Sequence, residues 1–443
     1  MSLQSRVTDA SPGSLPDPLS LTSERYADAC VALRLRGGRA GALDRYARVY
    51  RQGITTDPLA PVIIPPIART HQSESEEGTT VKFTQRVSRR LDGQMPAIAP
   101  TTTANSTTGA VGLGVIQATP TDTLEVESVL IPMIGRTRER AHTLCVSSQV
   151  GCAMGCTFCQ TAQMGLVRSL TTREIVAQWF AATHVLTKPD PGSRVSNIVF
   201  MGMGEPMDNL DSVIGAIEIL TDRRGPELSM SKITVSTVGR IDGIRRLAQR
   251  VRQTGWHRLG LAISLNAPSD EIRSSIMPVN RAMPMRALRE ELLAWPFFGG
   301  AHLCLEYVLI PGVNDSPLHA AQLAAFVNGE ESLAKARDIA IGEPPALSDS
   351  ERAQITPHSG AALRGLVNLI PYNPREGSPW GAPDEADVDR FVAWLKGLGV
   401  YCKRRRTKGR DQMAACGQLG NLAYKRQRAS AVLIDAPAPG AGA

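Results

Sequence analysis

The amino-acid sequence predicts an α/β fold, a partial (β/α) barrel preceded by a small helical domain. After Glu125, short β-rich runs alternate with stretches of helical length. The first 80 residues differ from this pattern, because a helix-like patch is followed there by a Pro-rich stretch. Repeated strand–helix units favour parallel strands joined by right-handed crossovers, and the site of such a barrel lies at the carboxyl ends of its strands.

The predicted strands are short runs rich in β-branched and apolar residues. A helix is clearest at Thr171-Thr172-Arg173-Glu174, which has capping-box spacing and is followed by apolar residues four positions apart. The strands are expected at Thr143–Val146, Asn197–Met201, Lys232–Ser236, Leu259–Ser264, Leu303–Ile310 and Val367–Ile370.

Changes in composition predict four parts of the chain. Residues 1–80 are expected to form an accessory domain with its helix-like patch at Ser23–Tyr50, and residues 81–124 a strand followed by a loop. From about residue 96 that loop is rich in Thr, Ala and Gly, with too few large apolar residues to offset its ordering entropy. The catalytic domain is expected at 125–425, interrupted by a Pro-, Ser- and Glu-rich insertion at Gly329–Gly365, and residues 426–443 are expected to be a disordered tail.

The overall composition is that of a globular protein, with 42% hydrophobic and 21% charged residues among 443. No apolar run reaches the roughly 18 residues of a membrane span, and the N-terminus lacks the order of a signal peptide, so we expect a cytoplasmic protein without membrane contact. The net charge of +7 is compatible with a polyanionic partner. The segment Lys403–Arg410 places six positive charges in eight residues, which suits an RNA backbone, although a solvated charged edge is the alternative.

Three of the eight cysteines fall within eight residues, at Cys152, Cys156 and Cys159. Three thiols on one loop, spaced in this way, can ligate three irons of a [4Fe–4S] cubane, because thiolates are the ligands that such clusters require. A zinc site would need a fourth protein ligand, and the nearest candidates, His142 and Cys145, precede the loop rather than form a second knuckle. Unconnected structural cysteines are a further alternative. With three protein ligands the fourth iron stays open, and S-adenosylmethionine (SAM) could chelate it through its amino and carboxylate groups.

The cysteine spacing resembles that of the radical SAM superfamily, and Phe158 before the last cysteine is similar to its frequent aromatic position. After the strand Asn197–Met201, the run Gly202-Met203-Gly204-Glu205-Pro206 resembles the superfamily's Gly-Glu-Pro segment. The resemblance implies that this turn, through its backbone and the Glu205 carboxylate, binds the amino group of SAM. A Gly-rich turn with a glutamate is otherwise an ordinary loop.

A wider set of motifs resembles the family of rRNA adenine methyltransferases that contains RlmN and Cfr. They cover roughly residues 125–421 in the family's order. The motifs are Thr143-Leu-Cys145-Val-Ser-Ser-Gln-Val-Gly-Cys152, Cys159-Gln-Thr-Ala-Gln-Met-Gly165, Ile233-Thr-Val-Ser236, Leu261-Ala-Ile-Ser264-Leu265-Asn266-Ala-Pro268, Glu306-Tyr-Val-Leu-Ile-Pro-Gly-Val-Asn314-Asp315, Asn368-Leu-Ile-Pro-Tyr-Asn373-Pro374 and Ala414-Ala-Cys416-Gly-Gln-Leu419.

This resemblance implies methylation of an adenine ring carbon, which polar displacement from SAM cannot achieve. In that family, a cysteine takes a methyl group from one SAM. A radical formed from a second SAM abstracts a hydrogen atom from this methyl group, and the resulting carbon radical adds to the base. By position, Cys416 matches the methyl carrier, Cys145 the thiol that resolves the adduct, and Glu127 the proton acceptor. Without this resemblance, the alternative interpretation is that Cys145 and Cys416 are buried structural thiols and that Glu127 is a surface residue. The SAM pocket is implied for Gly204, Glu205, Ser236, Ser264, Leu265, Asn266 and Asn373.

The expected substrate is carbon 2 of an adenosine in 23S rRNA, with tRNA as a further candidate and an electron donor such as flavodoxin as a partner. The resemblance also implies a disulfide bond. Two alternatives stay open: Cfr-like methylation at carbon 8, and a non-catalytic iron–sulfur protein that binds RNA. Retention of Cys145, Cys416 and the Gly204-Glu205 turn argues against the second, because binding alone needs none of them.

Overall fold

The structure is a computed structural model of the chain. It describes residues 15–75, 78–89, 123–134, 140–187, 193–299, 301–330, 340–375, 377–405 and 418–420. The expected loop at 96–124, apart from its last two residues, and the expected tail at 426–443 therefore lie outside the described residues. So does Cys416.

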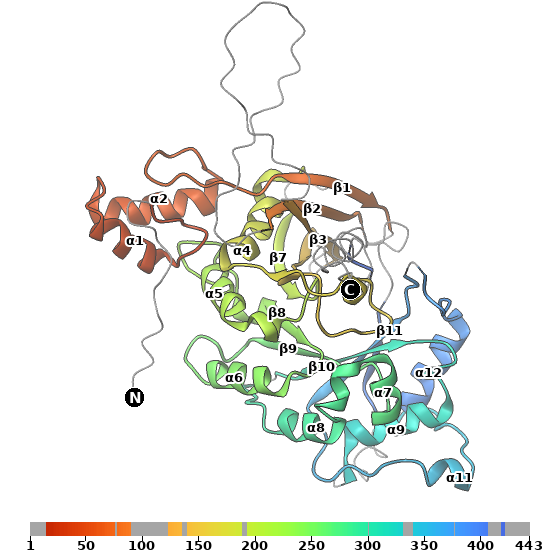
Figure 1. Cartoon of the computed structure of the whole chain (residues 1–443). Helices are drawn as coiled ribbons and strands as arrows, with labels where there is room; N and C mark the ends of the chain where they lie inside the picture. The colour runs from red at the N-terminus through yellow and green to blue at the C-terminus, as the bar shows by residue number, and fades with distance from the viewer. Residues whose placement is uncertain are drawn as a thin grey trace, which may run out of the picture.

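One large sheet organises the molecule (Figure 1). Its described strands follow the order β1-β2-β3-β4-β7-β8-β9-β10-β11-β12, and from β4 to β12 neighbouring strands are parallel. The parallel strands are β4 (Arg140–Cys145), β7 (Arg194–Phe200), β8 (Ile233–Thr237), β9 (Gly260–Ser264), β10 (Leu303–Leu309), β11 (Gly365–Pro371) and β12 (Cys402–Arg404). The partial (β/α) barrel predicted from the alternation of strands and helices is confirmed.

Antiparallel strands extend the sheet beyond β4. They are β1 (Ile67–Ser73), β2 (Thr80–Ser88) and β3 (Thr123–Ile134), paired in that order, with β3 joined to β4. A separate two-stranded ribbon pairs β5 (Gln149–Val150) with β6 (Arg168–Ser169) around the cysteine loop. Strand β1 lies within the range expected for the accessory domain, yet it is hydrogen-bonded into the main sheet.

Helices cover the outer face of the parallel strands, as Figure 1 shows for α4, α5, α6, α8 and α9. Helix α4 begins with the predicted capping box, in which Thr171 and Glu174 satisfy each other's backbone N–H groups. The longer helices are α4 (Thr172–Phe180), α5 (Leu210–Leu220), α6 (Ile241–Val251), α8 (Met285–Leu293), α9 (Pro317–Asn328) and α12 (Glu385–Gly397). Shorter ones are α3 (Gln160–Met164), α7 (Asp270–Ile276), α11 (Asp349–Arg352), the π-helix η1 (Ala181–Val185) and the 3₁₀ helices η2 (Pro206–Asn209), η3 (Met230–Lys232) and η4 (Pro278–Arg281).

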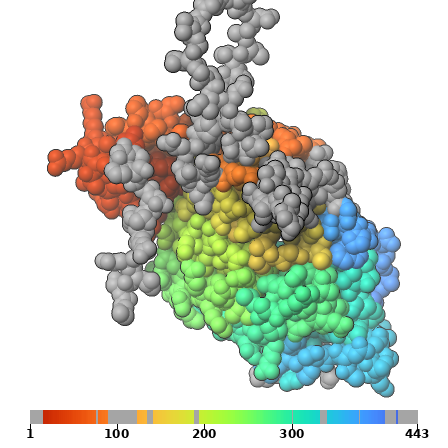
Figure 2. All heavy atoms as spheres, in the orientation of Figure 1, coloured from red at the N-terminus to blue at the C-terminus, as the bar shows by residue number. Residues whose placement is uncertain are grey.

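The helix-like N-terminal patch forms two helices, α1 (Ser23–Ala32) and α2 (Gly38–Gln52), at one end of the molecule (Figure 2, red). Three tyrosines hold the pair together from inside, because Tyr26, Tyr46 and Tyr50 are at most 2% exposed and their tilted rings contact one another in series. Tyr50 also contacts Trp179 of α4, with ring centroids 6.0 Å apart. The accessory helices are thus packed against the barrel. Within the described residues, none of the helices combines the length and the apolar character that crossing a bilayer requires.

Candidate active site

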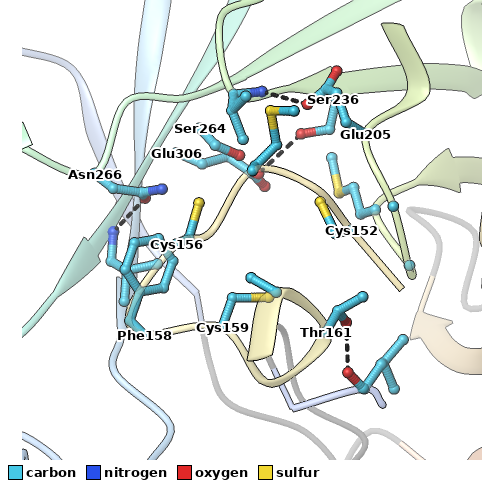
Figure 3. A pocket seen from close by; sticks show the side chains of 18 of the residues that line it. Cys152, Cys156, Phe158, Cys159, Thr161, Glu205, Ser236, Ser264, Asn266 and Glu306 are labelled. Carbon is cyan, nitrogen blue, oxygen red and sulfur yellow. Dashed lines mark hydrogen bonds between the residues drawn. The ribbon is translucent and has the colours of Figure 1, made fainter. Parts of the chain in front are cut away.

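A cavity of about 140 Å³ lies at the carboxyl ends of the parallel strands, where the barrel architecture predicts a site. Its walls come from the cysteine loop and from the residues that end or follow β7, β8, β9, β10 and β11. Figure 3 shows the three cysteines on one side, with Glu205, Ser236, Ser264 and Glu306 across from them. The sequence places these groups up to about 150 residues apart, and the fold brings them into one cavity.

The cysteine loop is held by backbone contacts that leave its thiols facing the cavity. Gly151 has φ +75°, and a Cβ there would lie 1.8 Å from the carbonyl oxygen of Gly165, so only glycine fits. That same carbonyl accepts the Cys152 N–H at 3.2 Å. Cys159 closes the loop as the N-cap of α3. Cys152, Cys156 and Cys159 all line the cavity, as the cluster hypothesis requires.

Burial keeps these thiols in their neutral form when they have no metal partner. It raises the pKa of Cys152 to about 12, and it raises the pKa of Cys156 and Cys159 as well. Iron binding releases such protons, because only thiolates ligate the metal. No three described Cys, His, Asp or Glu side chains gather around a point suited to a single metal ion. A cubane places its thiolates on three separate irons, so the donor set fits a cluster better than it fits zinc.

The Gly204-Glu205 turn carries a buried carboxylate into the cavity. Gly204 has φ +100°, and a Cβ there would lie 2.5 Å from Cβ of Gln149. The Glu205 carboxylate accepts the N–H groups of Met207 at 3.0 Å and Val238 at 2.9 Å, and Glu205 is 2% exposed. Burial raises the pKa of Glu205 to about 7, although these hydrogen bonds favour its charged form. A buried carboxylate of this kind is suited to a cationic or N–H-rich ligand.

The polar residues expected to bind SAM lie where the strands end. Ser236, Ser264, Asn266 and Asn373 all line the cavity together with Gly204 and Glu205. Asn266 adopts φ +57°, and its side-chain oxygen accepts the Val308 N–H at 3.0 Å. The side chain of Leu265 does not line the cavity but packs, fully buried, in the hydrophobic core. Leu265 therefore remains a predicted SAM-binding residue, and its contact with SAM would have to come from its backbone.

Glu127 and Cys145 lie on adjacent antiparallel strands, β3 and β4, beside the cavity rather than in its lining. Cys145 ends β4 and is 6% exposed. Glu127 is equally buried, and its Oε2 lies 3.0 Å from Lys82 Nζ and 3.1 Å from the backbone nitrogen of Gly420. An isolated surface glutamate, the alternative for Glu127, is ruled out by this burial.

The end of the C-terminal motif lies at the mouth of the cavity. Leu419 lines the cavity, and its carbonyl accepts a hydrogen bond from the Thr161 hydroxyl on α3. Gln418 donates to the Pro374 carbonyl at 3.1 Å. These residues follow Cys416 by two and three positions, so the described part of the motif is anchored to the cysteine loop and to the segment after β11. The position of Cys416 itself lies outside the described residues.

Two charged residues of the site were missed by reasoning from sequence. Glu306 of β10 lines the cavity, 7% exposed, with the Ser236 hydroxyl 3.4 Å from its Oε2. Burial raises its pKa, and the charge of Arg405 opposes that shift. Lys82 is the buried partner of Glu127. Glu306 is the single charge of an otherwise apolar strand, a pattern that could have identified it, whereas Lys82 lies in a largely polar strand that also carries Arg86.

Two arginines near the start of the basic run, Arg404 and Arg405, face acidic side chains of the protein. Arg404 pairs with Asp389 at 2.7 Å and also with Glu385, while Arg405 Nη1 lies 3.9 Å from Glu306. Residues 406–410 lie outside the described residues. The described residues also give no support to the expected disulfide bond: Cys30, Cys152, Cys156, Cys159, Cys304 and Cys402 carry free thiols.

Comparison with known proteins agrees with this geometry. Residues 146–324 match the model of the radical SAM superfamily. The probable dual-specificity RNA methyltransferase RlmN 1 of Protochlamydia amoebophila is 40% identical over 324 residues, which are 73% of this chain and 77% of that protein. The dual-specificity RNA methyltransferase RlmN of Phenylobacterium zucineum is 39% identical over 312 residues, 70% of each chain. A crystal structure of a radical SAM methyltransferase from Sphaerobacter thermophilus has a TM-score of 0.66 and 30% identity, and covers 90% of this chain and 98% of its own.

Proposed function

Because this chain belongs to the RlmN family of radical SAM RNA methyltransferases, we propose that it methylates carbon 2 of an adenosine in 23S rRNA. The observation that most supports this proposal is that the three cysteines, the Gly204-Glu205 turn and Leu419 of the C-terminal motif line one cavity. In this proposal, iron–sulfur ligation, SAM binding and the end of the methyl-carrying motif would therefore meet at one place. We also propose a tRNA adenosine as a second substrate of the enzyme, because the relatives are named dual-specificity RNA methyltransferases.

The residues present fit both cofactors that the family requires. The three cysteines would hold a [4Fe–4S] cluster, and Glu205, Ser236, Ser264, Asn266 and Asn373 would hold SAM. When bound together, the two groups supply a carbon-centred radical, with a second SAM as the methyl source. The chain's own contribution is to orient SAM through the strand-end polar groups. The buried apolar wall of the cavity, which includes Met154, Phe158 and Tyr372, limits the access of water.

Three further residues would handle the methyl group and the base. Cys416 would carry the methyl as a thioether, Cys145 would break the adduct between that sulfur and the RNA, and Glu127 would accept the proton lost from the ring carbon. Two contacts support placing these roles together: the Glu127 carboxylate accepts the Gly420 N–H at 3.1 Å, and Thr161 of α3 binds the Leu419 carbonyl. Both contacts hold residues that closely follow Cys416 in the sequence, Leu419 and Gly420, beside the cavity.

We further propose that the enzyme is cytoplasmic and receives electrons from a donor such as flavodoxin. RNA would approach the mouth of the cavity, where the basic run preceding Cys416 offers phosphate contacts. Lys403 remains available for this role, whereas Arg404 and Arg405 already face acidic groups of the protein. The two accessory helices would add a second RNA contact, since a structured RNA must be gripped while its adenine leaves the stack.

Substitution of the two mechanistic cysteines tests the proposal at separate steps. Cys416→Ala should give neither methylcysteine nor a covalent RNA complex, because the methyl carrier is gone. Cys145→Ala should load the methyl and add it to the adenine, and then stall with RNA attached through Cys416. Denaturing gels and peptide mass spectrometry of protein co-expressed with its RNA distinguish the two outcomes. Normal levels of methylated adenine in either variant would contradict the mechanism.

A further inference from the structure

Arg273 of α7 is a fully buried cation behind the active-site cavity. It is 0% exposed, and it is the largest side chain in the described core that is so completely covered. A guanidinium group does not lose its charge in proteins, so the charge itself is buried. Burying a charge is costly unless it is paired or hydrogen-bonded, and the partners of Arg273 therefore indicate its purpose.

The guanidinium group joins the strand ends that form the SAM pocket. Its Nε donates to the Leu265 carbonyl at 3.1 Å, and its Nη2 donates to the Val238 carbonyl at 2.5 Å and to the Ser264 carbonyl at 3.5 Å. Val238 in turn donates its N–H to the Glu205 carboxylate. Arg273 thus ties the segments after β8 and β9, which carry the SAM-binding groups, to a single helix.

The same helix supports the cysteine loop. The Ile276 carbonyl, three residues after Arg273, accepts the N–H of Thr157 at 3.0 Å. Ile276 and Met277 pack in one apolar cluster with Cys156 and Phe158. Helix α7 therefore places its buried cation directly behind the loop that holds the thiols.

The positive charge is not cancelled by an ion pair among the described residues. The hydrogen bonds of Arg273 all end on neutral oxygens, the carbonyls named above and the Asn280 amide at 2.8 Å. Burial lowers the pKa of Arg273 to about 10, and the negative charge of the Cys156 thiolate, followed by that of Asp270, opposes this. For Cys156, burial raises the pKa of the thiol and Arg273 lowers it. The electrostatic partner of Arg273 is thus a proposed cluster ligand.

We propose that Arg273 is a positioning residue whose buried charge stabilises the reduced form of the cluster held by Cys152, Cys156 and Cys159. The inference rests on the proposed iron–sulfur site. Adding an electron makes the cluster more negative, so a nearby cation that water cannot screen favours the reduced state. One unit charge about 12 Å from the cluster, in a medium of effective dielectric constant about 20, changes the ratio of reduced to oxidised cluster by about tenfold, and a shorter separation changes it more.

Arg375 offers a matched control, because it is a second arginine that contacts the cysteine loop. Its Nε donates to the Thr157 carbonyl at 2.8 Å, and its charge lowers the pKa of Cys159 against the larger effect of burial. Arg375 is only partly buried, so solvent screens its charge. Removing it should therefore change the cluster less than removing Arg273.

The test is a redox titration of the reconstituted enzyme without RNA, followed by the EPR signal of the reduced cluster. At the potential where the wild-type cluster is half reduced, Arg273→Gln should lower the ratio of reduced to oxidised cluster about tenfold, while Arg273→Lys, which keeps the charge, should stay within about twofold. Arg375→Gln should change the ratio by less than about threefold. Arg273→Met, which also removes the charge, should lower the ratio like Arg273→Gln, and it replaces Arg273→Gln in the test if that variant does not assemble.

The outcomes separate the inference from the proposed function. An unchanged ratio in Arg273→Gln or Arg273→Met would overturn the charge role. Equal losses in Arg273→Lys and Arg273→Gln would also overturn it, because hydrogen-bond geometry rather than charge would then matter. Absence of any cluster signal in the wild-type protein would instead contradict the proposed iron–sulfur function, together with the inference that rests on it.

Discussion

Replacing Lys82 with Met should destabilise the protein strongly, because the substitution leaves a buried carboxylate without its cation. Lys82 Nζ lies 3.0 Å from Glu127 Oε2, and the two side chains are 9% and 8% exposed. Among the described residues, the same oxygen also accepts the Gly420 N–H at 3.1 Å. Removing one member of a buried ion pair costs about 3–5 kcal/mol, whereas an exposed pair costs at most about 1 kcal/mol. We expect a loss within the range for buried pairs, because both side chains are largely shielded from water.

A double-mutant cycle measures this coupling. Lys82→Met, Glu127→Gln and the double variant are compared by urea unfolding of the cluster-free protein under reducing conditions, monitored by tryptophan fluorescence. The double variant should be more stable than the sum of the single losses implies, by about 2 kcal/mol or more, because it buries no unpaired charge. Lys82→Arg is the control that keeps the charge. A loss below about 1 kcal/mol in Lys82→Met, or additive losses in the cycle, would refute the reasoning.

Other predictions concern the cofactor site. Alanine at all three cluster cysteines should abolish iron incorporation on anaerobic reconstitution, and retention of the full EPR signal would disprove the ligand assignment. Because the pKa of Glu205 is raised to about 7, its charged fraction falls as the pH falls through 7, and calorimetry should show SAM affinity about tenfold weaker at pH 6 than at pH 8. Glu205→Gln should bind SAM weakly at both pH values, and a wild-type pH dependence in this variant would place the titrating group elsewhere. Gly204→Ala should also weaken SAM binding while the cluster remains, since its Cβ would clash with Gln149.

The barrel was predictable from sequence because most of its parallel strands are short apolar runs followed by a stretch of helical length. Such runs as Ile233–Thr237 and Gly260–Ser264 are mostly buried in the structure, as strands covered on both faces must be. The antiparallel strand β1 was harder to recognise. Its residues Ile67–Ser73 are largely polar and exposed, so the alternation that indicates a half-buried strand is absent.

The candidate site was predictable wherever spacing or a motif carried the information. The cysteine spacing and the Gly204-Glu205 turn are local patterns, and the structure places both in one cavity. Lys82, Arg273 and Glu306 were not predictable in the same way, because a charged residue in a sequence normally indicates a surface position. Their role depends on tertiary burial and on partners that lie elsewhere in the sequence: Glu127 is 45 residues from Lys82, Val238 is 35 residues from Arg273, and Ser236 is 70 residues from Glu306.

Methylation of carbon 2 of an RNA adenine by this chain can be measured by nucleoside mass spectrometry. RNA from a strain lacking the gene, and from the same strain complemented with the wild-type chain or with Cys416→Ala, is digested and compared for 23S rRNA and tRNA separately. We expect 2-methyladenosine in 23S rRNA only when the wild-type chain is present. Appearance of 8-methyladenosine instead would assign the carbon 8 reaction, and no difference between the strains would contradict the proposed activity.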